Sequence, residues 1–160
     1  QYEMIEEFKE ISLEASEFGL PSVLWSYPRG PNLNKDDETS IDTIAYAAHI
    51  AALLGAHIIK VKPPTSNIAD KSLKEKYENY QIDLDSLSDR VKHIKDCAFR
   101  SRKIVVFSGG NDKGDKEIIK EIKEIKKGGG NGSIIGRNTF QRPKKEALKL
   151  LDNIINIYKN

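Results

Sequence analysis

Apolar residues recur along this chain in two alternating patterns. In five segments they lie three or four positions apart, which is the period of an amphipathic helix. Between these segments lie short apolar runs rich in β-branched and aromatic residues, which are typical of strands. Helices and strands alternate strictly, so we predict a parallel sheet with helices packed outside it. The expected helices cover residues 1–18, 41–54, 84–98, 115–127 and 143–158, and the expected strands cover residues 20–27, 56–62, 103–108 and 133–135.

This alternation is compatible with two α/β folds, a doubly wound sheet and a TIM (β/α)8 barrel. Four strand–helix units make only half of a barrel, because a complete one takes about 250 residues. We expect a single domain over residues 1–160. Residues 63–83 show no clean period, so we predict a long loop or insertion after the second strand.

Composition excludes several classes of protein. The net charge of +2 is spread over interspersed acids and bases, so we expect no nucleic-acid partner. The longest apolar run, residues 47–59, is interrupted by His49, Gly55 and His57, so we expect no membrane span. The single cysteine, Cys97, suits a reducing compartment, and we therefore expect a cytoplasmic protein.

Two lysines, Lys60 and Lys62, end the second expected strand. Because strand side chains alternate between faces, both lysines point away from the side that Ile59 and Val61 bury against helices. Two buried lysines that repel each other favour a neutral amine, which Schiff-base chemistry requires. The alternative is that both lysines extend from the strand end to water. Spacing alone favours this second interpretation.

Glycine-containing turns follow the third and fourth expected strands. Ser108, Gly109 and Gly110 form the first turn, and Gly136 and Arg137 begin the second. Backbone amides of such turns, a hydroxyl group and a guanidinium group all suit a phosphate. A single glycine after a strand is an ordinary turn residue, but two such turns on successive strands favour a phosphate site.

Trp25 and Tyr27 lie on one face of the first expected strand. An aromatic pair of this kind usually packs in a core, and this interpretation stays open for Trp25. Tyr27 lies at the carboxyl end, one strand before Lys60. There its hydroxyl could act on a bound carbonyl compound as general acid or base.

The remaining candidates for chemistry are weaker. His49, His57 and His93 lack ligand spacing with a carboxylate or with Cys97, so we expect no metal site. Cys97 lies near the apolar side of its helix, where packing is a better interpretation than nucleophilic attack.

Five blocks of sequence, taken together, resemble the archaeal and bacterial type of class I fructose-bisphosphate aldolases. The blocks occur in the order of that family and extend over nearly the whole chain. The resemblance implies a TIM barrel, of which this chain would supply about strands 5–8. It also implies a Schiff-base lyase of glycolysis and gluconeogenesis that needs no metal or other cofactor, acts on a phosphorylated sugar and forms a homo-oligomer. The blocks are residues 23–30 (VLWSYPRG), 42–48 (DTIAYAA), 55–62 (GAHIIKVK), 108–110 (SGG) and 134–138 (IIGRN).

The resemblance also implies roles for single residues. Lys60 would form the Schiff base with fructose 1,6-bisphosphate, and Tyr27 would donate and accept protons. Trp25 would line the substrate pocket, Arg29 would contact the pocket or a second phosphate, and Lys62 would keep Lys60 neutral by repulsion. A substrate phosphate would be bound by Ser108, Gly109, Gly110, Gly136 and Arg137.

This sequence departs from the family pattern in one large respect. Residues 1–18 correspond to the helix after the fourth strand, so strands one to four, with an acidic residue of the catalytic network, have no counterpart. Position 1 is glutamine rather than methionine, and we expect a carboxyl-terminal half of a longer protein or a processed product. Two alternatives stay open: a related Schiff-base aldolase or transaldolase-like enzyme on another sugar phosphate, and an inactive half-barrel fragment.

Overall fold

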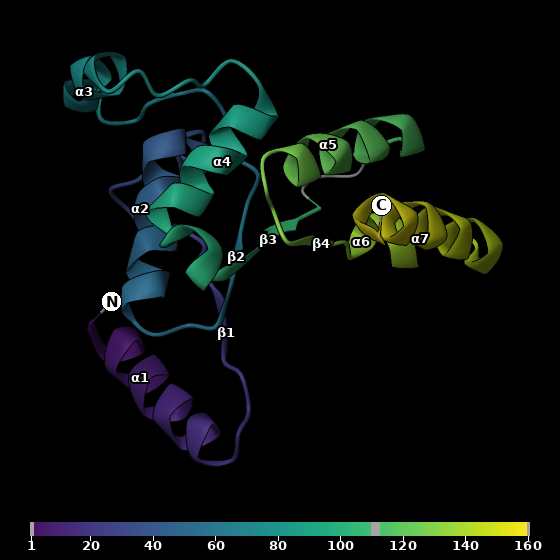
Figure 1. Ribbon diagram of the computed structural model, residues 1–160, viewed down its shortest axis with the longest axis horizontal. Coiled ribbons are helices and arrows are strands. Elements are labelled where there is room, and N and C mark those ends of the chain that lie inside the picture. Colours follow the sequence, from purple (N-terminus) through teal and green to yellow (C-terminus); the bar gives the residue numbers. More distant parts are fainter. Residues whose placement is uncertain (1, 110–112, 160) are drawn as a thin grey trace.

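The structure is a computed structural model that describes residues 2–109 and 113–159. Each strand is followed by a helical segment, as the hydrophobic pattern predicts, but the segments after the second and fourth strands each contain two helices instead of one (Figure 1). The strands are β1 (Val23–Trp25), β2 (Ile58–Val61), β3 (Ile104–Ser108) and β4 (Gly132–Ile134). The helices are α1 (Tyr2–Glu17), α2 (Ile41–Leu53), α3 (Lys74–Asn79), α4 (Leu87–Cys97), α5 (Asp115–Lys127), α6 (Arg137–Phe140) and α7 (Lys144–Lys159), with 3-10 turns at Asp37–Thr39, Lys71–Leu73 and Arg100–Arg102.

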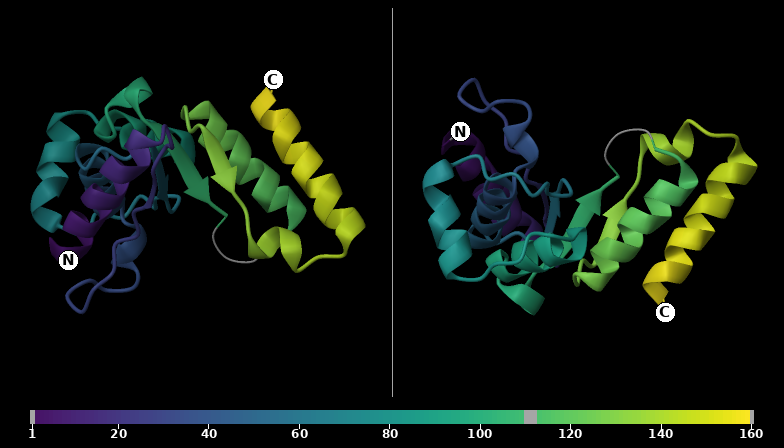
Figure 2. Two further views of the ribbon diagram at one scale, coloured as in Figure 1. Left: turned by 90° about the horizontal axis from the view of Figure 1, so that it is seen from below. Right: turned by 90° about the horizontal axis from the view of Figure 1, so that it is seen from above.

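The described strands form one parallel sheet in the order β1-β2-β3-β4. A doubly wound sheet reverses its strand order at a switch point, whereas here each strand pairs with the next one along the chain. Helices α2, α4, α5 and α7 pack side by side around one face of this sheet (Figure 2). The chain is therefore a parallel α/β half barrel, and this prediction is confirmed.

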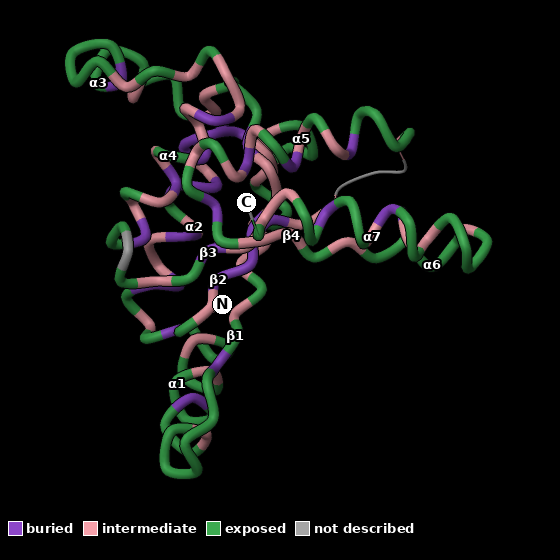
Figure 3. Tube along the Cα trace, turned by 45° about the vertical axis from the view of Figure 1, so that its right-hand side comes forward, coloured by how far each residue is buried: buried purple, intermediate pink, exposed green. Residues whose placement is uncertain are grey.

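The core lies between the sheet and its helices. Ile59, Val61, Val105 and Phe107 point toward the helices and are fully buried there, against a stripe of α2 that begins at Ile41. Burying a side chain of this size contributes about 1.5–3 kcal/mol. Buried stretches accordingly gather on the strands and on α2, whereas α1 and α3 are largely exposed (Figure 3).

The start of α4 differs from the prediction. The sequence suggests a cap at Asp83 or Asp85, but α4 is capped by Ser86. The Ser86 hydroxyl accepts a hydrogen bond from the Asp89 backbone N–H, and the Asp89 carboxylate accepts one from the Ser86 N–H. This reciprocal capping box satisfies two amides at once. Asp83 instead accepts a bond from the backbone N–H of Asp85 in the preceding turn.

Residues 63–83 are not a loop throughout, which corrects the prediction. They contain the 3-10 turn Lys71–Leu73 followed directly by α3. The Asp42 carboxylate anchors this segment to α2 by accepting hydrogen bonds from the amides of Ala69 and Asp70, both at 2.9 Å. A six-residue helix that buries mainly Tyr77 is too short to show a hydrophobic period. No described helix is long and apolar enough to cross a bilayer.

Candidate active site

Lys60 lies on the face of β2 opposite the helices, in the middle of a cleft. Lys60 is only 6% exposed, although it lies on the face opposite the core residues Ile59 and Val61. The Lys60 Nζ lies 3.6 Å from the centre of the Trp25 ring and 5.8 Å from that of Tyr27. Within residues 2–109 and 113–159, Nζ has no hydrogen bond or ion pair. The alternative in which Lys60 extends into water does not hold.

Trp25 and Tyr27 reach the cleft because the residue between them points the other way. Ser26 donates a hydrogen bond from its hydroxyl to the Ala47 carbonyl of α2 at 2.8 Å. Strand alternation then directs Trp25 and Tyr27 to the opposite side, where their ring centres lie 6.2 Å apart. Trp25 is 63% exposed, so the core-packing interpretation fails for this residue. Both rings form one wall beside Lys60.

Lys62 is held by an ion pair that the sequence does not predict. Its Nζ donates to Oε2 of Glu38 at 2.6 Å, and both side chains are about three-quarters buried. This hydrogen bond holds the pKa of the Glu38 carboxyl below its ordinary value, against the opposing effect of burial. Because Glu38 balances the charge of Lys62, repulsion between Lys62 and Lys60 is weaker than the sequence interpretation assumed.

The turn after β3 lies against β4. The Gly109 N–H donates to the Ile134 carbonyl at 3.1 Å, so this amide is used by the sheet and not by a ligand. A Cβ on Gly109 would lie 3.3 Å from a side-chain atom of Ile135, so a larger residue would require Ile135 to shift by a few tenths of an ångström. Ser108 lines the cleft. Gly110, also predicted to bind phosphate, lies outside the described residues.

The turn after β4 presents a different set of donors. Gly136 accepts bonds from the amides of Thr139 and Phe140 at 2.8 and 3.1 Å, which starts α6. The amides of Gly136 and Arg137 precede that first bond and have no acceptor among the described residues, as is usual at the start of a helix. The exposed side chain of Arg137 extends beside them.

One cleft of about 1170 Å³ brings these groups together. Cationic side chains outnumber carboxylates along its described walls, which suits an anionic ligand. All predicted site residues within the described ranges line it: Trp25, Tyr27, Arg29, Lys60, Lys62, Ser108, Gly109, Gly136 and Arg137.

Several residues of the cleft were not identified from the sequence. Glu38 and Lys35 come from the loop before α2, and Lys113 and Glu121 form an ion pair on the wall beyond β3. Arg90 of α4 lines the cleft and donates from Nε to the Pro64 carbonyl at 3.0 Å. Partners this far apart leave no local pattern. The sequence offers only the weak signal that Glu38 lies in the segment between β1 and α2 and Lys113 in the segment between β3 and α5.

The other candidate residues are engaged in packing. Burial, followed by the nearby Asp96, raises the pKa of the Cys97 thiol to about 11, so it stays protonated at neutral pH. His49 Nδ1 lies 2.9 Å from the Cys97 carbonyl oxygen, and His93 Nε2 lies 3.2 Å from the Tyr77 hydroxyl. No cluster of three or more His, Cys, Asp or Glu side chains suited to a metal occurs among the described residues.

Comparison with known proteins identifies the family of this chain. Residues 1–142 match the family model described as DeoC/LacD family aldolase. The chain is 37% identical over 142 residues to a class 1 fructose-bisphosphate aldolase of Halobacterium salinarum, which covers 89% of this chain and 44% of that protein. It is 32% identical over 152 residues to a fructose-bisphosphate aldolase/6-deoxy-5-ketofructose 1-phosphate synthase of Methanocaldococcus jannaschii, covering 94% of this chain and 42% of that one.

A solved structure extends the similarity to the fold. An archaeal fructose-1,6-bisphosphate aldolase, with its catalytic lysine covalently bound to the carbinolamine intermediate of the substrate, superposes with a TM-score of 0.76 at 28% identity. The match covers 99% of this chain and 53% of that one, so the chain spans about half the length of the proteins it matches. By the family model that covers most of its length, the chain belongs to the DeoC/LacD aldolase family.

Proposed function

We propose that this chain supplies the Schiff-base half of a class I fructose-1,6-bisphosphate aldolase. The observation that carries the proposal is Lys60, a buried amine in an open cleft, with the aromatic rings of Trp25 and Tyr27 beside it. A lysine in a partly desolvated site is the nucleophile used for carbonyl substrates. The solved relative that holds a carbinolamine on its catalytic lysine supports this chemistry.

The proposed reaction begins at the ketone carbon of the substrate. The neutral amine of Lys60 attacks this carbon to form a carbinolamine. Tyr27 donates the proton with which the carbinolamine hydroxyl leaves as water, which gives a protonated iminium and leaves Tyr27 as a phenolate. The bond between carbons three and four then breaks, its electron pair moves into the iminium, and Tyr27 takes the proton of the carbon-four hydroxyl. Glyceraldehyde 3-phosphate leaves. Protonation and hydrolysis of the remaining enamine release dihydroxyacetone phosphate and regenerate Lys60.

The two turns would orient the ketone by binding its phosphate. Ser108 contributes a hydroxyl, and Gly136 and Arg137 contribute amides and a guanidinium group at the carboxyl ends of neighbouring strands. Such orientation of a reacting carbon lowers the barrier without new chemistry. Arg29 and Lys62, on the other side of Lys60, are proposed to contact the second phosphate.

Borohydride trapping tests the assignment. The protein is incubated with dihydroxyacetone phosphate, reduced, digested and analysed by mass spectrometry. We expect an adduct on the peptide that contains Lys60, its loss in Lys60→Met, and its retention in the matched control Lys62→Met. An adduct on Lys62, or none on any lysine, would contradict the proposal.

A second candidate keeps the Schiff base and changes the substrate. The Methanocaldococcus jannaschii relative carries two activities in its name, fructose-bisphosphate aldolase and 6-deoxy-5-ketofructose 1-phosphate synthase. Cleavage assays with fructose 1,6-bisphosphate and with a deoxyketose 1-phosphate separate the two, because only the first substrate has a second phosphate for Arg29 and Lys62. A chain that traps neither ketone would fit the remaining alternative, an inactive half barrel.

For the assembled protein we propose a cytoplasmic homo-oligomer with no nucleic-acid or membrane partner.

A further inference from the structure

We propose that Arg142 is a positioning residue for phosphate binding, which holds the segment after β3 in register with the turn after β4. The inference rests on the proposed function, because it assigns to Arg142 the alignment of the two turns that would bind the substrate phosphate. Arg142 itself does not line the cleft. It would therefore act through the residues that do.

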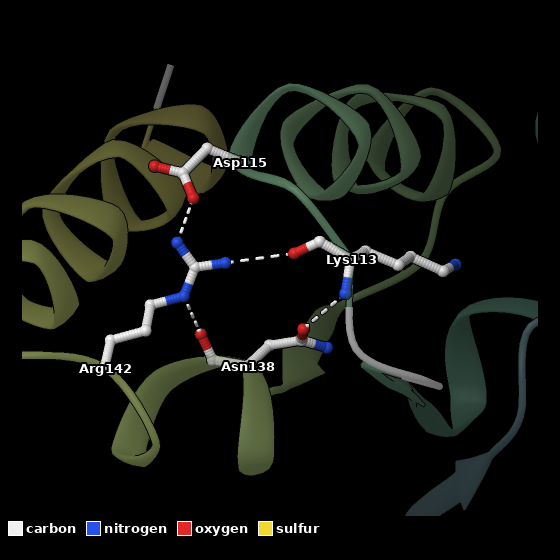
Figure 4. A network of polar contacts seen from close by, with 4 residues as sticks. All are labelled: Lys113, Asp115, Asn138 and Arg142. Atoms are coloured by element: carbon white, nitrogen blue, oxygen red, sulfur yellow. Dashed lines mark hydrogen bonds and ion pairs between the residues drawn. The ribbon is translucent and has the colours of Figure 1, made fainter.

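The guanidinium group of Arg142 bonds both segments at once (Figure 4). Its Nε donates to the Asn138 carbonyl of α6 at 2.5 Å, and its Nη2 donates to the Lys113 carbonyl at 3.0 Å. Its Nη1 forms an ion pair with Asp115 at the start of α5. The Arg142 side chain is 19% exposed and that of Asp115 58%. The two bonds to backbone carbonyls are therefore the better protected part of this network.

Asn138 continues the network on the side of the cleft. Asn138 is only 2% exposed, and its Oδ1 accepts a hydrogen bond from the Lys113 N–H at 2.9 Å. Its Nδ2 donates to the Gly109 carbonyl at 3.2 Å. Asn138 directly follows Arg137, so the position of the anion-binding turn is tied to both Gly109 and Lys113. Arg142 fixes the backbone of Asn138 and hence the geometry of this connection.

The shape of the arginine side chain explains why it suits this position. A guanidinium group is planar and offers five donors in a fixed fork, so three acceptors from two segments can be bound in one plane. A lysine carries the same charge but lacks the fork and cannot hold the same three acceptors in this geometry. Displacing a turn by about 1 Å is enough to weaken an oriented contact substantially.

The test compares two ketones that differ only in the phosphate. Borohydride trapping of the full chain is measured against the concentration of dihydroxyacetone phosphate and, separately, of dihydroxyacetone. For Arg142→Ala we expect the half-saturating concentration of dihydroxyacetone phosphate to rise about tenfold, the effect of about 1.4 kcal/mol in binding. The value for dihydroxyacetone should stay unchanged, because the Lys60 amine is not altered. Arg142→Lys should restore less than half of the loss.

Two further variants serve as controls. Arg102→Ala removes an exposed arginine just before the opposite end of β3 and should shift neither ketone. Asp115→Asn removes only the exposed partner of Arg142 and should shift dihydroxyacetone phosphate by less than Arg142→Ala does. An equal shift for both ketones in Arg142→Ala would mean a general structural role, and no shift for either would mean no role. Both results overturn the proposal.

Binding of inorganic phosphate, followed by ³¹P NMR, separates this proposal from the Schiff-base assignment. If the protein traps neither ketone, the proposed function fails, but weaker phosphate binding by Arg142→Ala and Arg142→Lys would still support the positioning role. If phosphate binds the variants as it binds the parent protein, the positioning role fails even where Lys60 is trapped. If Arg142→Ala does not fold, the comparison rests on Arg142→Lys.

Discussion

The two faces of the sheet differ in how their side chains are held. On the helix face, Ile59, Val61 and Phe107 are fully buried in close packing. On the cleft face, the Lys60 Nζ lies 3.6 Å from the centre of the Trp25 ring, and Trp25 is mostly exposed. A single strand, β2, therefore contributes to stability through alternate residues and to chemistry through the others. Changes on the helix face should lower stability, whereas changes on the cleft face should lower activity with little effect on folding.

Tyr27→Phe should have the largest effect, and it should lower activity without lowering stability. The variant keeps the ring that lies near Lys60 and removes only the hydroxyl group. In the complete enzyme, loss of a general acid or base should slow cleavage of fructose 1,6-bisphosphate by about 10²–10⁴-fold. The Schiff base should still be trapped, and the melting temperature should not change. Normal cleavage by this variant would remove Tyr27 from the mechanism.

Gly128→Ala should have the largest effect on the helix face. Gly128 ends α5 against α4, and an added Cβ would lie 2.3 Å from the Ser88 carbonyl oxygen and 2.7 Å from the Cβ of Val91. Backbone cannot yield easily, so we expect a loss of about 1–3 kcal/mol in the free energy of unfolding in urea. Gly30→Ala, where no atom lies within 4 Å of the added Cβ, is the control. Equal stability of the two variants would show that α5 and α4 can separate at little cost.

The comparison of faces also explains what could be predicted from the sequence. Strand alternation separates Lys60 from Ile59 with no knowledge of the fold, and glycines after strands mark the turns that begin at Ser108 and Gly136. The resemblance to aldolases rests on these same local blocks. The bonds that hold the cleft together are not local. Lys62 and Glu38 are 24 residues apart and the Arg142 bond to Lys113 spans 29, so no periodicity predicts either contact.

The residue that caps α4 could not be identified from the sequence for a related reason. Asp83, Asp85 and Ser86 are all suitable caps by residue type, and only the reciprocal bond with Asp89 distinguishes Ser86. Competing local signals of similar strength are decided by tertiary contacts. The packing of Leu87, the partly buried first residue of α4, against the core is one such contact.

Ser86→Ala tests this cap and should have a moderate effect. Removing the hydroxyl leaves the Asp89 amide without its acceptor, which should lower the free energy of unfolding by about 1 kcal/mol. Ser86→Thr keeps the hydroxyl and should retain most of the stability. Because Ser86 belongs to the helix layer, Schiff-base trapping should be the same in both variants. A stability loss as large in Ser86→Thr as in Ser86→Ala would point to packing rather than to capping.

Glu38→Gln should have the smallest effect. It tests whether the ion pair between Glu38 and Lys62 influences both stability and chemistry. The hydrogen bond from Lys62 lowers the pKa of Glu38 in the folded protein. Burial opposes this effect, and the positive charge of Lys62 adds to it. A lowered folded-state pKa stabilises the fold above the ordinary glutamate value of 4.5, and this stabilisation is lost as the pH falls through the folded-state value. The difference in unfolding free energy between the parent protein and Glu38→Gln should therefore be present at neutral pH and disappear in acid.

The same variant has a second consequence on the cleft face, because it leaves Lys62 without its counter-charge. An unpaired Lys62 adds positive charge to the cleft, so Schiff-base trapping should reach half-saturation at a lower concentration of dihydroxyacetone phosphate than in the parent protein. Glu10→Gln, which removes an exposed α1 carboxyl that has no ion pair among the described residues, controls for the change in net charge. An unchanged half-saturating concentration of dihydroxyacetone phosphate, together with a stability difference that persists in acid, would mean that the ion pair influences neither face.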